Sequence, residues 1–153
     1  MSTTFSAGPQ QVDPRGLRFA ATLTALVLAG ALVSVTAQRE VAVALTAVQA
    51  VVFAVGAFLG VRQSPYARLF ARFVRPRLAA PAELEDAAPP QFAQAVGLVF
   101  ALIALVGFAL SAPAVALTAL AFALVAAVLN AAVGLCLGCE LYLLWRRVAP
   151  ERA

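Results

Sequence analysis

Four long apolar stretches constrain the fold of this 153-residue chain more than any other feature. They occupy residues 17–37, 41–61, 92–110 and 114–145. A helix of about 20 residues crosses the roughly 30 Å hydrocarbon core of a membrane, because each residue advances it by about 1.5 Å. Inside lipid the backbone must satisfy its own hydrogen bonds, which favours helices. The pattern predicts an all-α, polytopic membrane protein with four transmembrane helices.

The composition excludes a soluble domain of this size. Hydrophobic residues make up 63% of the chain and charged residues 12%, whereas soluble domains are roughly half apolar and a quarter charged. A cleavable signal peptide is the alternative for the first stretch, with Val35-Thr36-Ala37 as a cleavage site. We favour an uncleaved helix, because the stretch exceeds the roughly 7–15 apolar residues of a typical signal and a second stretch follows at once.

The connections between the stretches predict two antiparallel hairpins. Only residues 38–40 separate the first two stretches, and residues 111–113 separate the last two. Residues 62–90 form the long loop between the hairpins. The membrane domain is expected to cover residues 13–147. It is flanked by a polar N-terminal tail, residues 1–12, which is predicted to be disordered, and by a C-terminal tail, residues 148–153.

The fourth apolar stretch is too long for one perpendicular crossing. Some thirty helical residues extend roughly 45 Å, well beyond the hydrocarbon core. The helix predicted over residues 114–145 must therefore tilt strongly, project beyond the membrane or break. Gly134 and Gly138 flank the expected position of a break.

Arginine supplies every basic residue of the chain and orients the predicted helices. Basic residues that flank membrane helices gather on the cytoplasmic side, and of the eleven arginines only Arg39 falls on the other side of the predicted topology. The sequence therefore predicts an inner-membrane protein with both termini and loop 62–90 in the cytoplasm. A nucleic-acid partner is not predicted, because the arginines flank apolar stretches and do not line a soluble face.

The first half of loop 62–90 has the pattern of an interfacial helix. Over residues 65–76, Arg68, Arg72 and Arg75 share one helical face. Such helices lie in the headgroup layer of a bilayer with their arginines toward anionic lipid. A plain cytoplasmic loop explains the same arginines equally well. Residues 79–90, which are rich in proline and acidic residues, are predicted to be a flexible linker.

Both cysteines of the chain, Cys136 and Cys139, lie beside Glu140 near the end of the fourth stretch. Cys139 is seven residues before Arg146, which places it about 10 Å inside the predicted cytoplasmic flank. Cys-x-x-Cys spacing permits a local disulfide and is typical of redox couples. At helical spacing the two thiols and the carboxylate share one face. We therefore predict a candidate catalytic site of these three residues.

Polar residues at the starts of the first and third predicted helices lie at the same membrane level and are predicted to support this site. Arginine stabilises a thiolate, and glutamine can donate hydrogen bonds to it. No metal site or cofactor is predicted, because the chain has no histidine and two cysteines, whereas a tetrahedral site takes four ligands. The alternative is that the cysteines only pack and that the carboxylate reaches the interface as a surface charge. The supporting residues are Arg15, Arg18, Gln91 and Gln94.

Three motifs together resemble a family of small bacterial membrane proteins, largely actinobacterial, that is known as a domain of unknown function. The motifs are Asp13-Pro14-Arg15-Gly16 with Arg18-Phe19, Pro90-Gln91-Phe92-Ala93-Gln94, and Cys136-Leu137-Gly138-Cys139. The resemblance extends from about residue 12 to residue 147 and implies a four-helix integral membrane protein. Members of this family often accompany thioredoxin-like proteins and sulfurtransferases, which implies a thiol or sulfur role. Gln91 departs from the pattern, since the family often has arginine at that position.

These observations leave three functional hypotheses open. The first is a thiol–disulfide or sulfur-relay component that exchanges with a thioredoxin-like or sulfurtransferase partner. The second is a small transporter or channel subunit, and the third is a structural subunit without chemistry of its own. The bilayer is the one partner that the composition requires. Whether the chain is an enzyme and whether it forms a homo-oligomer are left open by the sequence.

Overall fold

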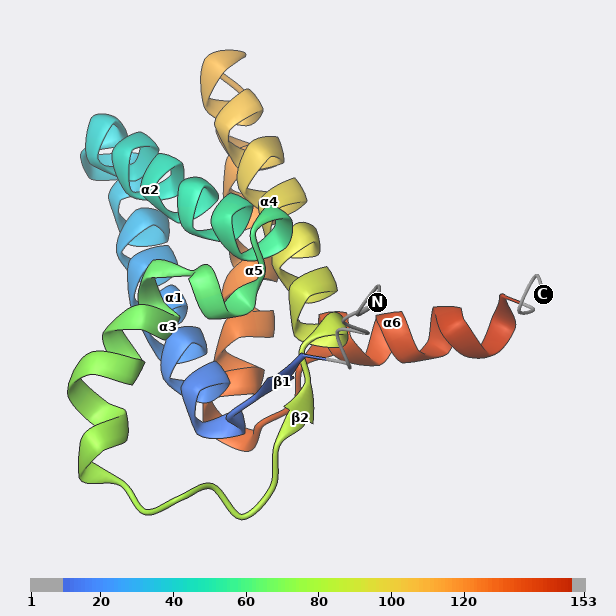
Figure 1. The fold of residues 1–153 in the computed structure, drawn as a ribbon. Coiled ribbons are helices and arrows are strands. Elements are labelled where there is room, and N and C mark those ends of the chain that lie inside the picture. Colours follow the sequence, from blue (N-terminus) through green and yellow to red (C-terminus); the bar gives the residue numbers. More distant parts are fainter. Residues whose placement is uncertain (1–9, 150–153) are drawn as a thin grey trace, which may run out of the picture.

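A computed structural model describes residues 10–149, and within them four long apolar helices pack as two hairpins (Figure 1). The first hairpin is α1 (Pro14–Ala37) and α2 (Arg39–Phe58), and the second is α4 (Ala88–Ala109) and α5 (Pro113–Val133). All four helices are long and apolar enough to cross a membrane. The predicted fold class is confirmed, and the chain is a multi-pass membrane protein.

Each of these helices contacts two of the others. Both α1 and α4 pack on α2 and α5, so that neighbouring helices run antiparallel. The short turns of both hairpins lie at one end of the bundle (Figure 1). The opposite end holds the long connection between the hairpins, and we call it the arginine-rich end. Its arginines are Arg15, Arg18, Arg62, Arg68, Arg72, Arg75, Arg77, Arg146 and Arg147.

Small side chains fill the interfaces between the helices. The main buried cluster consists mostly of alanine, with Leu28, Leu120 and Phe108 as its large side chains. Helices in lipid associate through close packing, for which small residues are favoured. Gly107 shows how close this packing is, because a Cβ atom there would lie 2.8 Å from the backbone nitrogen of Ala116.

A buried hydrogen-bonded chain ties the two helices of the first hairpin to the loop. Gln49, in the middle of α2, is completely buried. Its Nε2 donates to Thr24 Oγ1 of α1 at 3.3 Å, and its Oε1 accepts from the Tyr66 hydroxyl at 2.9 Å. Burial raises the pKa of the Tyr66 hydroxyl, which therefore stays protonated as a donor at neutral pH. These bonds satisfy a side chain that would be costly in lipid without partners.

The connection between the hairpins is more ordered than the sequence indicates. The segment predicted as a helix over residues 65–76 is helical but changes its winding twice, and its Phe70 packs against Phe19 of α1 with ring centroids 5.7 Å apart. Parts of the predicted tail and linker form a two-stranded antiparallel sheet. Next to this sheet, the amide of Ala87 donates a further hydrogen bond to the carbonyl of Gln10. Residues 1–9 and 150–153, which belong to the predicted tails, lie outside the described residues. The elements of this region are β1 (Gln11–Val12), η1 (Val61–Gln63), α3 (Pro65–Leu69), the π-helical η2 (Phe70–Val74), η3 (Arg75–Arg77) and β2 (Glu85–Asp86).

The helix predicted over residues 114–145 is divided in the structure. α5 ends at Val133, and α6 (Leu137–Val148) follows after a short connection. Gly134 ends α5 in the left-handed conformation, with φ of 73°, which costs little for a residue without a Cβ atom. Of the three outcomes expected for this stretch, the structure shows the break. α6 consequently leaves the bundle at a steep angle to α5 (Figure 1).

Replacing Gly107 with alanine tests the close approach of α4 and α5. The added methyl group meets backbone rather than a movable side chain, so we expect the unfolding free energy to fall by about 2 kcal/mol. Gly30→Ala in α1 is the matched control, because its Cβ would meet only the end of the Leu45 side chain, at 3.4 Å. The measurement is unfolding in mixed detergent micelles followed by circular dichroism. Equal stability of the two variants would contradict the tight α4–α5 contact.

Candidate functional site

The two cysteines form a disulfide at the beginning of α6. Cys136 and Cys139 are bonded to each other, with their Cα atoms 5.2 Å apart. Cys136 is the N-cap of α6, and its sulfur accepts a hydrogen bond from the backbone amide of Cys139 at 3.3 Å. Both residues are partly exposed. The pair is therefore a short loop closed at a helix N-terminus.

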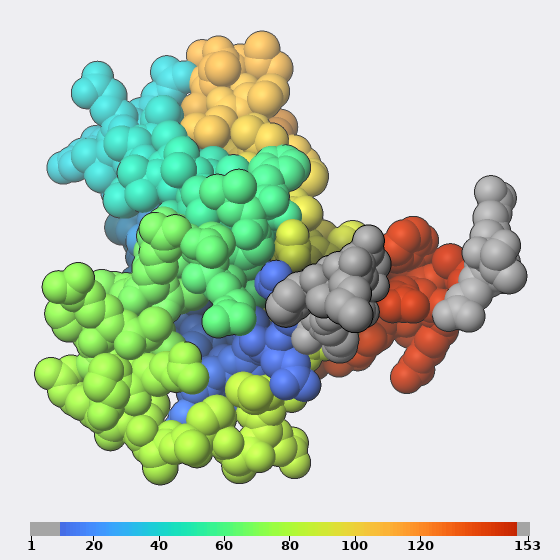
Figure 2. Space-filling model, viewed as in Figure 1, coloured from blue at the N-terminus to red at the C-terminus, as the bar shows by residue number. Residues whose placement is uncertain are grey.

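Helix α6 is attached to the bundle mainly through α4. A Cβ atom on Gly138 would lie 2.7 Å from the Cα of Ala93, so the two backbones are in close contact. One turn later the Tyr142 ring lies against Phe92, with centroids 5.6 Å apart. The remainder of α6 projects beyond the bundle, where Figure 2 shows it standing clear of the four long helices.

The exposed part of α6 is amphipathic. Leu137, Leu141, Leu144 and Val148 follow one another at intervals of three or four residues and are all exposed. Arg146 and Arg147 occupy other faces of the same helix. This arrangement is typical of a helix that lies in the plane of a membrane interface. The spacing of these apolar residues was the signal in the sequence that α6 is a separate amphipathic helix and not the end of the fourth transmembrane helix.

Arg18 lies beside the connection that leads to the cysteines. Its guanidinium donates to the carbonyl oxygens of Ala131 and Ala132 in the last turn of α5, at distances between 2.9 and 3.3 Å. The last carbonyls of a helix have no partner within the helix, and a positive charge there also complements the helix dipole. Arg18 therefore fixes the end of α5 four to five residues before Cys136, the N-cap of α6.

The other predicted supporting residues have different partners. Arg15 forms an ion pair with Asp13 at 2.9 Å and also donates to the carbonyl of Ala79. Gln91 donates to the carbonyl of Ala57 in the last turn of α2 at 2.8 Å. Both side chains thus hold the arginine-rich end together through bonds that do not involve the cysteines.

Gln94 and Glu140 differ from the rest in lacking such bonds. Gln94 Oε1 is buried without a hydrogen-bond donor and lies where a Cβ atom on Gly56 would be 2.9 Å away. Glu140 is exposed in the first turn of α6. The prediction that it shares one helical face with both thiols assumed one continuous helix, whereas α6 begins only at Leu137 and Cys136 is its N-cap. Acidic residues are favourable in the first turn of a helix.

The three loop arginines predicted to bind lipid headgroups also differ from one another. Arg68 donates to Gln63 Oε1 at 2.6 Å, and Arg72 lies over the Phe73 ring at 5.6 Å. Arg75 points toward a pocket between the loop and α1. No three Cys, His, Asp or Glu side chains of residues 10–149 gather as metal ligands would.

A family model of a domain of unknown function, DUF4395, matches residues 12–147 of the chain. The match therefore includes all four long helices, the connection between the hairpins and the cysteine pair. No curated protein and no solved structure shows significant similarity to the chain.

Arg18→Gln tests the cap on α5. Loss of the charged donor should loosen the end of α5, so the amides of Gly134 and Leu135, which donate to the carbonyls of Asn130 and Leu129, should exchange about fivefold faster. Hydrogen–deuterium exchange of peptides covering residues 130–136 provides the measurement. Arg72→Gln removes the same charge from the loop and should leave these peptides unchanged. Unchanged exchange in Arg18→Gln as well would contradict the cap.

Asp13 makes the stability of the arginine-rich end depend on pH. Hydrogen bonds from the Arg15 side chain hold the pKa of the Asp13 carboxyl below its usual value. A lowered pKa in the folded state means that the stabilisation is complete above the unfolded pKa of about 4 and is lost as pH falls through the folded value. Asp13→Ala should lower stability by about 1 kcal/mol at pH 7, and by much less near pH 2.

The measurement is the unfolding temperature of the wild type and of Asp13→Ala at both pH values. Asp13→Asn keeps a capping oxygen but loses the ion pair, so it should fall between them at pH 7. A wild-type advantage that is the same at both pH values would contradict the contribution of the charged pair.

Proposed function

We propose a thiol–disulfide exchange function for this chain, which belongs to the DUF4395 family. The single observation behind the proposal is the Cys136–Cys139 disulfide at the N-terminus of α6. Thiol chemistry requires a thiolate, an accessible sulfur atom and a second sulfur to release the product. The N-cap position, the partial exposure and the close spacing of the two cysteines supply these three requirements.

The geometry favours Cys136 as the sulfur that meets the partner. As the N-cap it lies outside the first turn, where the unpaired amides and the positive end of the helix dipole stabilise an anion. The amide of Cys139 already donates to its sulfur. Cys139 lies within the first turn, next to the Gly138 contact with α4. Cys139 is therefore assigned as the resolving cysteine, held close to Cys136 by the contact of α6 with α4.

The exchange balances without a further reagent when the partner is a dithiol protein. A partner thiolate attacks the Cys136 sulfur, which forms a mixed disulfide and releases the Cys139 thiolate. The second thiolate of the partner then attacks the partner sulfur that is bonded to Cys136. This step closes a disulfide within the partner and releases the Cys136 thiolate. Two electrons have passed from the partner to the cysteine pair, and the two thiol protons of the partner are released or taken up by the new thiolates. The reverse sequence oxidises the pair.

The positive-inside rule places the arginine-rich end, and with it the disulfide, in the cytoplasm of an inner-membrane protein. Cytosolic reductants keep structural disulfides rare, so a cysteine pair that forms a disulfide there is typically transient and catalytic. A soluble thioredoxin-like protein or a sulfurtransferase is the partner class that would approach from this side. Interfacial helix α6 would hold the disulfide at the membrane surface.

Glu140 has a proposed supporting role in the reverse sequence, where it accepts the proton of the Cys139 thiol as this thiol attacks the mixed disulfide and the pair is oxidised. It follows Cys139 directly in the first turn of α6 and is exposed. Glu140→Gln removes the acceptor but keeps the side-chain size. This variant should slow exchange by severalfold while leaving the circular dichroism spectrum unchanged.

Mixed-disulfide trapping in cells tests the exchange function. Cys139→Ser removes the resolving sulfur and should accumulate a covalent adduct between Cys136 and a partner, visible as a reductant-sensitive mass shift. Cys136→Ser is the matched control and should give at least tenfold less adduct, because it lacks the sulfur that is attacked first. Repeated absence of an adduct from Cys139→Ser, with the protein present in the membrane, would overturn the proposal. Equal adducts from both variants would overturn the assignment of the two roles.

A further inference from the structure

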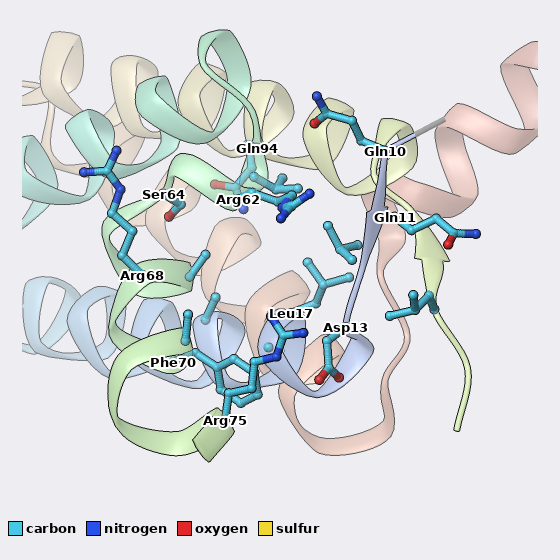
Figure 3. Close-up of a pocket in the computed structure, with 17 residues that line it drawn as sticks. Gln10, Gln11, Asp13, Leu17, Arg62, Ser64, Arg68, Phe70, Arg75 and Gln94 are labelled. Carbon is cyan, nitrogen blue, oxygen red and sulfur yellow. The ribbon is translucent and has the colours of Figure 1, made fainter. Parts of the chain in front are cut away.

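A pocket of about 620 Å³ lies at the arginine-rich end, and neither cysteine belongs to its lining (Figure 3). It opens between β1, the start of α1, Gln94 of α4 and the loop elements η1, α3, η2 and η3. Gln94, six residues beyond the start of α4 at Ala88, lies about 9 Å along that helix. The pocket thus begins at the loop and extends to the depth at which the long helices enter lipid.

The rim of the pocket carries more positive than negative charge, because Arg62, Arg68 and Arg75 line it together with the single carboxylate of Asp13. Arg68 donates to Gln63, whereas the side chains of Arg62 and Arg75 make no hydrogen bond or close ion pair within residues 10–149, although the charge of Arg75 also acts on Asp13. Arg62 lies on one side of the pocket with Gln94, and Arg75 lies on the opposite side (Figure 3). The carboxylate of Asp13 also lines the pocket, but Arg15 neutralises it at 2.9 Å. The balance of these charges attracts an anion.

The interior of the pocket combines an unsatisfied polar group with apolar walls. Gln94 Oε1 is buried without a donor, and buried polar atoms in folded proteins nearly always have a partner. Leu17 and Phe70 belong to the walls. The Gln94 oxygen packs against Gly56 of α2, so the surface that the pocket offers to a ligand consists of arginine side chains, of which those of Arg62 and Arg75 lack hydrogen-bond partners, and of apolar walls.

We propose that this pocket binds the phosphate group of an anionic lipid. Guanidinium groups are the side chains best suited to bind phosphate, because their paired N–H donors match its oxygen atoms. The apolar walls suit the first carbons of the lipid. The position of the pocket at the level where the helices enter the membrane also fits this ligand. Free phosphate shares the same chemistry and is separated from lipid by the experiment.

The neighbouring arginines provide an internal control. Arg72 belongs to the same loop and carries the same charge but does not line the pocket, since it lies over the Phe73 ring. General attraction of a basic surface to anionic lipid would depend on all of these arginines alike, by about fivefold for each charge. Binding in the pocket depends on Arg62 and Arg75 specifically.

The test uses the full chain purified in a non-ionic detergent. Its unfolding temperature is measured during separate titrations with phosphatidylglycerol, phosphatidylcholine and inorganic phosphate, for the wild type and for Arg62→Gln, Arg75→Gln and Arg72→Gln. Phosphatidylglycerol should raise the unfolding temperature, whereas phosphatidylcholine should have little effect. The apparent affinity for phosphatidylglycerol should fall at least tenfold in Arg62→Gln and Arg75→Gln, and fivefold or less in Arg72→Gln.

The outcomes separate the alternatives. A shift with inorganic phosphate alone, lost in Arg62→Gln and Arg75→Gln, would confirm the phosphate site and assign it to a soluble ligand instead of a lipid. Equal losses in all three variants would show surface attraction only and overturn the pocket, as would the absence of any shift with both anions. If Arg62→Gln fails to fold, Arg62→Lys keeps the charge but loses the paired N–H donors, so its affinity should fall by about threefold to tenfold; wild-type affinity in this variant would overturn the guanidinium–phosphate contact.

Discussion

The backbone of a chain in lipid must find all its hydrogen-bond partners within the protein, and the rest of this structure depends on that requirement. Helices satisfy most of these groups, but the last carbonyls of each helix stay unpaired. At three helix ends, a polar side chain from a neighbouring helix donates a hydrogen bond to such a carbonyl. Arg39 donates to Phe108 of α4, Gln91 to Ala57 of α2, and Arg18 to Ala131 and Ala132 of α5.

This use of polar residues explains how the site is assembled. The cap by Arg18 and the left-handed Gly134 end α5 together, so the chain can change direction without leaving carbonyls unpaired. The new helix α6 begins after a short connection, and its Cys139 amide donates to the sulfur of Cys136. The same break that divides the fourth apolar stretch therefore creates the helix N-terminus at which the proposed exchange takes place. The change of direction between α5 and α6 and the proposed thiol exchange both depend on this one turn of the chain.

The sequence was sufficient for features that depend on length and periodicity. Apolar stretches of helical length and three-residue connections determine the two hairpins, and the Cys-x-x-Cys spacing permits the observed disulfide. The sequence did not predict hydrogen bonds between side chains and the ends of other helices. Nothing local to Arg18 or Gln91 shows which carbonyl each will reach, because that depends on how the helices pack. For the same reason the pocket around Gln94 had no signal in the sequence.

The redox state of the cysteine pair in intact cells is the measurement that tests the account most directly. Thiols are blocked with one alkylating reagent in living cells, disulfides are then reduced, and the newly released thiols are labelled with a heavier reagent. If the disulfide takes part in exchange, Cys136 and Cys139 should be partly oxidised and should become reduced when a membrane-permeable reductant is added. A pair that stays fully reduced, and that reacts only after denaturation, would contradict the central claim and identify the cysteines as packing residues.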